Sequence, residues 1–383
     1  MRIVFLTHYT ALYGANRSLL NLIDGLANYG VVAHVVSPGE GAITDALRSR
    51  GVGVAVLPLQ WWVSRHGGRR DVVRRLYHNI KLLPTLARQV RQWEIDVVYT
   101  NSAFLPVGAM LAGWVRLPHV WHLREFCDLD YGFQHDWGAR VFRQVVEQAD
   151  AKIAISKAVR SHLLHSMGSE SVHVIYNGVA SKAEFDNLYE RANSEGSDKE
   201  EYTFAVVGLI NPNKGQEVAI RALATIAGRV PTARLLIVGS GGKAYVDRCR
   251  ELSGELGIAD RVEFWGYVED PYKAYMASDA ILMCSRYEAL GRTTLEAMAC
   301  CRPVIGYDEA GTAEVIEHEH TGLLYRDGPE SLARCMARFV DNPGWARQLG
   351  ERGWHVARRK YTIEVCAEQV YRVLQSVVTA THA

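Results

Sequence analysis

The chain has 383 residues, of which 48% are hydrophobic and 22% charged, and its formal net charge is +1. This length accommodates two ordinary domains with one hydrophobic core each, and the near-neutral charge gives no support to a general nucleic-acid binder. The longest nearly apolar run, FLPVGAMLAGWV, is much shorter than the about 20 residues that span a bilayer. The seven cysteines lack metal-like spacing, and the N-terminal MRIVFLTHY resembles a strand rather than a signal peptide. We therefore expect a cytoplasmic protein.

Short β-rich runs alternate with segments of helical periodicity along the whole chain. RIVFLT is followed by NRSLLNLIDGLANYG, whose apolar residues fall on one helical face, and DVVYTN, LPHVWHL and AKIAIS follow as further strands. The alternation restarts with YTFAVVG and ARLLIVGS after a polar stretch at residues 181–201. Strands that alternate with helices are typical of parallel, doubly wound sheets.

The polar stretch predicts an interdomain linker. We expect an α/β protein with two Rossmann-like domains whose parallel sheets face a central cleft. The first domain would span residues 1–185 and the second residues 200–361. The C-terminal segment 362–383 is predicted to be a helix, and its pattern alone allows packing on either domain.

Three segments combine a predicted strand end with residues that suit an anionic ligand. In HYTALYGANRS, Gly14 permits close backbone approach before a helix, or is needed only for the turn. In VGLINPNKGQEVAI, Lys214 can neutralise a phosphate, or is a solvated surface lysine. In PHVWHLREF, His122 and Arg124 would point into the cleft, and the alternative for His122 is a satisfied core histidine.

The stretch SRYEALGRTTLEAM places Glu288 in a loop and Glu296 inside the following helix. If Gly291 to Thr294 open that helix, their N–H groups can hold a diphosphate. Carboxylates would repel a diphosphate, so each glutamate should instead accept hydrogen bonds from hydroxyls on either side. The spacing therefore fits a nucleotide-sugar, with Glu288 at the sugar and Glu296 at the ribose. The alternative is that Glu296 is a surface helix residue.

A rival interpretation comes from VGSGGKA, in which Gly239, Gly241 and Ala244 match the dinucleotide fingerprint G-x-G-x-x-A. This pattern suggests a nicotinamide or flavin enzyme. It lies late in the chain, however, and the first strand–helix turn lacks the glycine triple.

The stretch YEALGRTTLEAMACCRPVIGY resembles the E-x7-E signature of glycosyltransferase family 4, a retaining family with the GT-B fold. YGANRSLLNLIDGLANYG is similar to the first loop and helix of the family, and VIYNGV to its segment before the linker. VGLINPNKG is similar to the phosphate-binding loop, and AGTAEVIEHEHTGLLY to a late segment. The resemblance spans nearly the whole chain and implies that the C-terminal helix completes the N-terminal domain.

The resemblance also implies roles in binding a UDP-sugar or GDP-sugar. Lys214, the backbone N–H of Gly14 and Thr293 would hold the diphosphate. Glu288 would face the transferred sugar, with the backbone around Leu290 and Gly291. Two further contacts are implied by the family, those of Glu296 with the ribose and of Val268, through its main chain, with the base.

The reaction implied by the resemblance is sugar transfer with retention, without a metal or other cofactor. His122 would sit beside the reacting sugar and the leaving phosphate. Products of such enzymes are glycolipids, polysaccharides and other glycoconjugates. The alternatives are a GT-B nucleotide-sugar epimerase and a protein that binds the donor without turnover.

Two positions depart from the family pattern. Leu209 stands where an arginine usually follows the glycine of the phosphate loop, which implies weak donor binding, a substitute cation such as Arg292 or Arg124, or loss of activity. Asn16 replaces a glutamate that is common in the first loop, which makes Asn16 and Arg124 candidates for the acceptor side.

The segment from Trp61 to Trp93 carries eight arginines and lysines but only one acidic residue. A basic helix flanked by aromatic residues can lie on an anionic membrane, here the inner face, where a lipid-linked acceptor would be found. The alternative is an ordinary amphipathic helix on the sheet, with solvated arginines.

Overall fold

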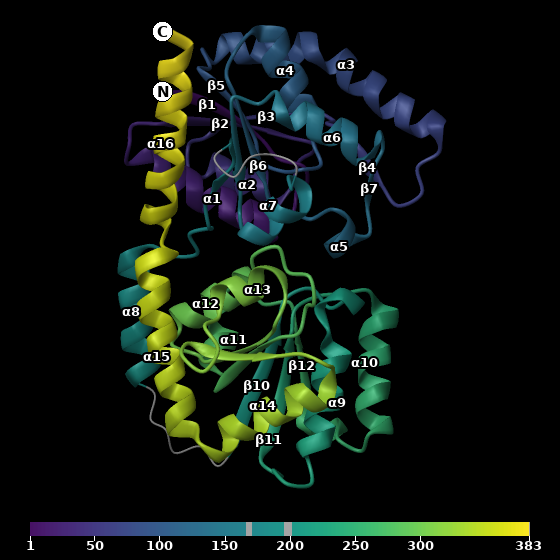
Figure 1. Cartoon of the computed structure of the whole chain (residues 1–383), viewed down its shortest axis with the longest axis vertical. Helices are drawn as coiled ribbons and strands as arrows, with labels where there is room; N and C mark the ends of the chain where they lie inside the picture. Colours follow the sequence, from purple (N-terminus) through teal and green to yellow (C-terminus); the bar gives the residue numbers. More distant parts are fainter. Residues whose placement is uncertain (166–170, 195–200, 383) are drawn as a thin grey trace. The chain divides into compact units, whose positions relative to one another are not determined.

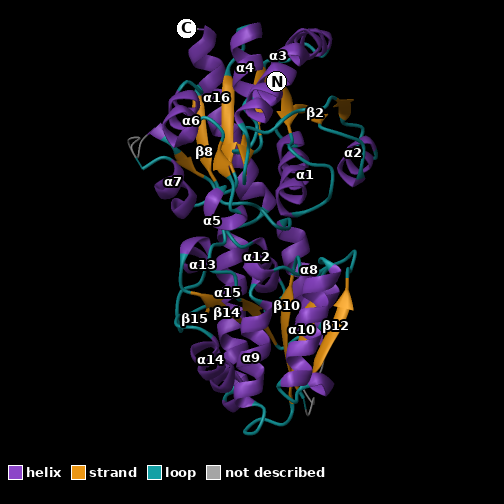
Figure 2. Cartoon of the chain, turned by 90° about the vertical axis from the view of Figure 1, so that its right-hand side faces the viewer, coloured by secondary structure: helices purple, strands orange, loops and turns teal. Residues whose placement is uncertain are grey.

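The computed structural model describes residues 1–165, 171–194 and 201–382. The chain forms two compact units, of which the first comprises Met1–Gly178 with Ile363–Ala383 and the second comprises Val179–Thr362. Each unit has a parallel sheet with helices packed against it (Figures 1 and 2).

The sheet of the first unit has seven strands in the order β3-β2-β1-β5-β6-β8-β9, and all its pairings are parallel. The strands are β1 (Arg2–Leu6), β2 (Val32–Ser37), β3 (Gly53–Val56), β5 (Val97–Thr100), β6 (His119–Leu123), β8 (Ala151–Ala154) and β9 (His173–Val174). The helices are α1 (Gly14–Ala27), α2 (Ala42–Arg48), α3 (Arg69–Gln92), α4 (Val107–Val115), α5 (Asp128–Tyr131), α6 (Gly138–Glu147), α7 (Lys157–Leu163) and α16 (Ile363–His382).

The C-terminal helix α16 is part of the core of the first unit and lies beside α1 (Figure 1). Val370 and Leu374 of α16 are fully buried with Ile3 and Phe5 of β1. Close approach of the two helices depends on Gly25, because a Cβ atom there would lie 2.6 Å from Cβ of Ala367. The apolar periodicity of the last 20 residues is therefore used to close the first unit.

The sheet of the second unit has six parallel strands in the order β12-β11-β10-β13-β14-β15. The strands are β10 (Tyr202–Val207), β11 (Ala233–Val238), β12 (Val262–Gly266), β13 (Ala280–Met283), β14 (Val304–Tyr307) and β15 (Gly322–Tyr325). The helices are α8 (Lys182–Ser194), α9 (Gln216–Ile226), α10 (Lys243–Glu255), α11 (Tyr272–Met276), α12 (Arg292–Ala299), α13 (Ala310–Val315), α14 (Pro329–Asp341) and α15 (Pro343–Lys360), with short 3₁₀ turns at Pro212–Lys214 and Ala259–Arg261.

Both sheets reverse their strand order once, between β1 and β5 in the first unit and between β10 and β13 in the second. At such a switch point the loops that leave the two central strands diverge to opposite sides and leave a crevice at the carboxyl edge. The fold thus offers one ligand-binding position in each unit before any side chain is considered.

The expected fold class, two Rossmann-like α/β domains with parallel sheets, is confirmed. Two details differ. β15 was not foreseen as a strand, and an antiparallel pair, β4 (Val63–Ser64) with β7 (Gln134–His135), extends the first unit.

The predicted linker also proves different where it is described. Residues 182–194 form α8, which packs on α15 of the second unit, so the units divide at residue 178 rather than 185. The buried side chains of Phe185 and Leu188 form the inner side of α8, and Arg358 forms an ion pair with Asp186. The part of the predicted linker at 195–200 lies outside the described residues.

Candidate functional site

The switch point of the second unit brings together Lys214, from the loop after β10, and Glu288, from the loop after β13. The Nζ atom of Lys214 donates to Oε2 of Glu288 at 2.6 Å, and both side chains are partly exposed, at 33% and 18%. The lysine and the first glutamate of the E-x7-E stretch, 74 residues apart, therefore form one charged pair at the carboxyl edge of the sheet.

Two glycines fix this geometry. Gly215 has φ +71°, and a Cβ atom there would lie 2.7 Å from the carbonyl oxygen of Cys284, so only glycine lets the Lys214 turn pack on the end of β13. Gly291 has φ +82° and directly precedes α12; its missing Cβ would lie 3.3 Å from Cγ of Glu288. The N-terminus of α12 consequently begins next to the Lys214–Glu288 pair.

The first turn of α12 contains two of the predicted site residues, Arg292 and Thr293. Thr293 is half-buried and its Oγ1 donates to the carbonyl of Val207 at the end of β10, at 3.3 Å. Leu290, just before the turn, is buried, and the carbonyl of Glu288 accepts from Gly311 N–H at 2.8 Å. The first amides of a helix lack intrahelical acceptors and favour an anion, so this turn can cradle a phosphate.

Glu296 is not a surface helix residue, since its exposed fraction is 6%. Its Oε2 accepts from the hydroxyl of the buried Tyr275 at 2.7 Å, and its Oε1 accepts from Nε of Arg292 at 2.6 Å. A carboxylate has about four lone-pair positions, so these two bonds orient Glu296 and leave capacity for further donors. Tyr275 was missed at the sequence level, because nothing in its own segment links it to a residue 21 positions away.

Three more residues of the second unit were singled out from the sequence, namely Val268, Arg292 and Leu209. Val268 lies half-buried in the loop after β12. Arg292 donates to Glu296 and to the carbonyl of Val179, so it would have to share these partners to act as a second cation in place of the arginine missing at Leu209. Leu209 itself uses its carbonyl to accept from Gln216 Nε2 at 3.0 Å.

The dinucleotide fingerprint has a packing explanation. A Cβ atom on Gly239 would lie 1.8 Å from the carbonyl oxygen of Gly208, and one on Gly241 would lie 2.2 Å from that of Ile210. Both glycines therefore allow the loops after β10 and β11 to touch. Their presence requires no nicotinamide or flavin cofactor.

In the first unit, His122 is fully buried within a polar network. Its Nδ1 lies 2.6 Å from the hydroxyl of Tyr99 and 3.3 Å from Nη2 of Arg124. Arginine can only donate, so Nδ1 accepts and the proton lies on Nε2. Burial, with a smaller contribution from Arg124, holds the pKa of His122 well below its usual value, so the imidazole is neutral. Its Nε2 has no hydrogen-bond partner among the described residues.

Arg124 and Asn16, the candidates for the acceptor side, are both buried and have internal hydrogen-bond partners. Arg124 is 5% exposed, and its Nε and Nη1 donate at 2.6 Å to Asn101 and Asn177. Asn16 is completely buried; its amide donates to the carbonyls of Tyr9 and Ala11 and its oxygen accepts from Thr7. Both side chains hold loops in place because internal partners already use their polar atoms.

Gly14 is the exposed first residue of α1. No described atom lies within 4 Å of the position that a Cβ would take there, and its φ is not positive. The described part of the chain thus gives no steric reason for glycine, which leaves room for close approach of a ligand.

Two family models together match most of the chain. The model described as Glycosyltransferase Family 4 matches residues 13–182, and the one described as Glycosyl transferases group 1 matches residues 190–355. The GDP-mannose-dependent alpha-(1-6)-phosphatidylinositol monomannoside mannosyltransferase of Mycobacterium tuberculosis is 31% identical over 355 residues, which cover 84% of each chain. The chain belongs to glycosyltransferase family 4.

Other proteins match with different coverage. An uncharacterized glycosyltransferase of Methanocaldococcus jannaschii is 32% identical over 232 residues, so the match spans 58% of that relative's length. Among solved structures, Anabaena HepE in complex with UDP superposes with a TM-score of 0.81 at 22% identity, covering 98% of this chain and 100% of HepE. This likeness shows a shared GT-B fold.

Proposed function

We propose that this glycosyltransferase transfers a sugar, with retention, from a nucleotide diphospho-sugar to an acceptor hydroxyl. The observation that carries the proposal is the Lys214–Glu288 pair beside the N-terminus of α12 at the switch point of the second unit. A cation and helix amides favour the donor diphosphate, whereas a carboxylate favours sugar hydroxyls. Glu296, oriented by Tyr275 and Arg292, would accept from the ribose.

The donor class is also supported by relatives. HepE was solved with UDP, and the M. tuberculosis relative is named for its use of GDP-mannose. We therefore propose a UDP-sugar or GDP-sugar, with Thr293 and Gly14 at the diphosphate and Val268 at the base.

In the proposed reaction, the bond between the sugar anomeric carbon and the diphosphate oxygen breaks as the acceptor oxygen bonds to the same face of that carbon. The acceptor proton passes to the leaving phosphate. Lys214 and the amides of α12 stabilise the charge that develops on the diphosphate, without a metal ion. His122 is proposed to act as a neutral donor through Nε2–H.

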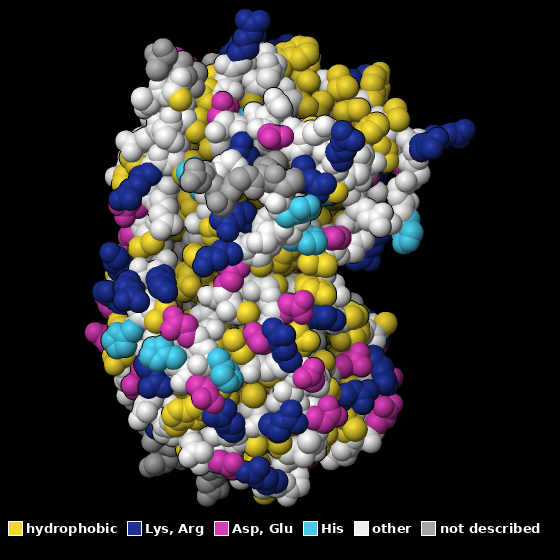
Figure 3. Space-filling model, viewed as in Figure 1, with side chains coloured by type: hydrophobic (Ala, Val, Ile, Leu, Met, Phe, Trp, Pro, Cys, Tyr) yellow, Lys and Arg dark blue, Asp and Glu magenta, His cyan; other side chains and the backbone are white. Residues whose placement is uncertain are grey.

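We propose a lipid acceptor because of the side chains that helix α3 exposes. One face of α3 buries Leu83, Leu86 and Val90 in the core, as an ordinary amphipathic helix would. Its other side exposes Val73, Tyr77 and Ile80, at 56%, 52% and 45%. Figure 3 shows apolar and basic side chains together over this part of the unit.

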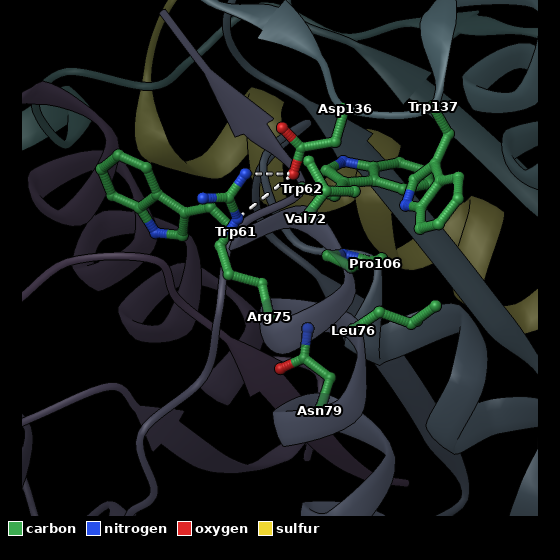
Figure 4. A pocket seen from close by; sticks show the side chains of 9 residues that line it. All are labelled: Trp61, Trp62, Val72, Arg75, Leu76, Asn79, Pro106, Asp136 and Trp137. Atoms are coloured by element: carbon green, nitrogen blue, oxygen red, sulfur yellow. Dashed lines mark hydrogen bonds and ion pairs between the residues drawn. The ribbon is translucent and has the colours of Figure 1, made fainter. Parts of the chain in front are cut away.

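The start of α3 is anchored rather than loosely solvated. Arg75 donates to Asp136 at 2.6 Å, and both line a small cavity together with Trp62 and Trp137 (Figure 4). Arg70, Arg74 and Lys81 are exposed beside the apolar side chains. We propose that this side of α3 contacts anionic lipid. No helix among the described residues has the length and apolar character needed to cross a bilayer.

The test of the proposed function is ¹H NMR of reactions that contain UDP-glucose or GDP-mannose and a hydroxyl acceptor, with and without EDTA. The proposal expects release of the nucleoside diphosphate and a product anomeric configuration equal to that of the donor. An inverted product would contradict retention, and donor that changes its sugar without releasing nucleotide would indicate an epimerase.

A further inference from the structure

The short helix α11 of the second unit carries a tyrosine whose hydroxyl reaches Glu296, the residue proposed to contact the ribose. Tyr275 is fully buried, and its hydroxyl donates to Oε2 of Glu296 at 2.7 Å. The two residues are 21 positions apart in the sequence, so this bond joins α11 to α12.

The hydroxyl of Tyr275 is the donor in this bond. Burial, together with the charge of Glu296, raises the pKa of Tyr275 well above its usual value, so the phenol keeps its proton. A phenol has one proton to donate, and the bond to Glu296 uses it. Because the side chain is also fully buried, an effect of Tyr275 on a ligand has to pass through the carboxylate of Glu296.

Helix α11 is fixed at both ends, although it has only five residues. At its start, the N–H of Tyr272 donates to Oδ1 of Asp270 at 3.0 Å. At its end, Arg302 donates from Nε to the carbonyl of Tyr275 and from Nη2 to that of Met276, both at 3.1 Å. These bonds satisfy groups that helix ends leave without intrahelical partners. The backbone that carries Tyr275 is therefore held in place independently of a ligand.

The carboxylate of Glu296 is held at both oxygens by donors from different elements. Oε1 accepts from Nε of Arg292, one turn earlier in α12, at 2.6 Å, and Oε2 accepts from Tyr275 of α11. With Arg292 as the only donor, the carboxylate could rotate about its last side-chain torsion, which is a broad one in glutamate. The second donor removes this freedom, so the remaining lone pairs keep fixed directions. A fixed acceptor binds a matching hydroxyl with less loss of conformational entropy.

The burial of Glu296 makes a missing ligand hydroxyl costly. Its side chain is 7% exposed, which lets a ligand group reach it but leaves little room for bulk water. A site that is built to bond a hydroxyl rejects an analogue without that hydroxyl, because a buried polar group is then left without its partner. Ribose carries two such hydroxyls, and deoxyribose lacks one of them.

We propose that Tyr275 is a positioning residue that makes the nucleotide site select ribose over deoxyribose, by fixing Glu296 at the ribose hydroxyls. The inference rests on the proposed function for the binding of a nucleotide by this unit. The selectivity follows from the bond between Tyr275 and Glu296 and from the burial of both side chains.

Calorimetric titration of the whole protein with UDP, GDP and their 2′-deoxy and 3′-deoxy analogues tests this inference. We expect the wild type to bind the ribonucleotide about tenfold or more tightly than one of its deoxy analogues, because a hydrogen bond to a charged group is lost. In Tyr275→Phe, which removes only the hydroxyl, this preference should fall by about fivefold, the size of a typical hydrogen bond, mainly through weaker ribonucleotide binding. Tyr202→Phe, half-buried at the amino end of β10, is the matched control and should leave both affinities unchanged.

The ratio of the two affinities separates positioning from a general structural role, which would weaken both ligands alike. Because Tyr275 acts through Glu296, adding Tyr275→Phe to Glu296→Ala should leave the ratio as it is in Glu296→Ala alone. A further fall in the double variant would contradict the inference. If Tyr275→Phe does not fold, Arg302→Gln, which releases the last carbonyls of α11, should lower the ratio instead.

Two results would overturn the inference and leave the proposed function intact. One is equal binding of the ribonucleotide and both deoxy analogues by the wild type. The other is an unchanged ratio in Tyr275→Phe or, failing that variant, in Arg302→Gln. Binding of no nucleoside diphosphate by the wild type would contradict the proposed function and this inference together.

Discussion

At the scale of single residues, the ion pair between Lys214 and Glu288 implies a competition. The Nζ atom of Lys214 donates to the carboxylate of Glu288 at 2.6 Å. A donor diphosphate would have to share or displace this contact, while the sugar would approach the glutamate.

We therefore predict opposite effects for the two partners. Glu288→Gln should tighten binding of free UDP or GDP by about 1 kcal/mol, roughly fivefold, because partly exposed ion pairs are worth about that much. It should also slow sugar transfer. Lys214→Met should weaken nucleotide binding. Calorimetric titration measures both, and a Glu288→Gln variant that binds the nucleotide more weakly than the wild type would contradict the competition.

Glu125 supplies a prediction about stability. Burial is the main cause that raises the pKa of Glu125 to about 7 from 4.5, opposed by the bonds from Ala103 and Ser102 and by Arg124, with Asp130 and Cys127 also nearby. The folded state therefore holds a proton that the unfolded state has lost between these pH values. Stability from this group falls as pH rises from about 4.5 to 7, by up to about 3 kcal/mol.

Glu125→Gln removes this penalty. Its melting temperature relative to the wild type should rise between pH 5 and pH 8, while the buried histidines, common to both proteins, cancel in the comparison. Thermal unfolding across that range is the measurement. A difference that is constant with pH would show that Glu125 is ionised throughout or is not buried in solution.

Particular residues show how much of the candidate site could be predicted from the sequence. His122 and Arg124 were predicted from strand alternation, and the E-x7-E spacing with the resemblance indicated Glu288 and Glu296. Lys214 was predicted from its place before Gly215 at the opening of a helix. His8 and Glu125 were quoted within the same segments but not selected, since they follow the ends of their strands and meet only in three dimensions. Sequence periodicity predicts which face of a helix or strand is buried, but it does not predict which loop residues lie close together in the folded chain.

At the scale of elements, a polar composition led to a wrong prediction where a helix buries only a small face. α8 buries Phe185 and Leu188 and exposes most other residues, so its composition resembles a linker. The parallel strands were predictable because they are buried on both faces and consist of continuous apolar runs. β15 (GLLY) lies between the polar segments HEHT and RDG and was not identified as a strand.

Helix α3 makes the membrane proposal testable. Replacing Arg70, Arg74 and Lys81 by Gln should reduce binding to anionic liposomes by about 3 kcal/mol, roughly a hundredfold, at about 1 kcal/mol for each basic residue. The matched control replaces Lys243, Arg248 and Arg250 of α10 in the second unit, of which Lys243 and Arg250 are exposed and Arg248 is half-buried. Co-sedimentation that is equal for neutral and anionic liposomes would refute contact through charge.

At the scale of the whole molecule, the last helix of the chain completes the first unit. Leu374 of α16 is fully buried in that core. Leu374→Ala should cost about 2–5 kcal/mol and increase hydrogen exchange in residues 1–178 much more than in residues 201–362. Gln375→Ala, exposed on the same helix, is the control. Equal deprotection of both units would show that they unfold as one.

The central claim, that the second unit binds a nucleoside diphosphate at its switch point, is tested most directly by a thermal-shift screen. The ligands are UDP, GDP, ADP, CMP, TDP, NAD and NADP, with EDTA present throughout. We predict that UDP or GDP raises the melting temperature, since a ligand at a hundred times its Kd stabilises by about 2.7 kcal/mol, and that Lys214→Met reduces the shift. A shift with NAD or NADP alone, or with no nucleoside diphosphate, would contradict the account.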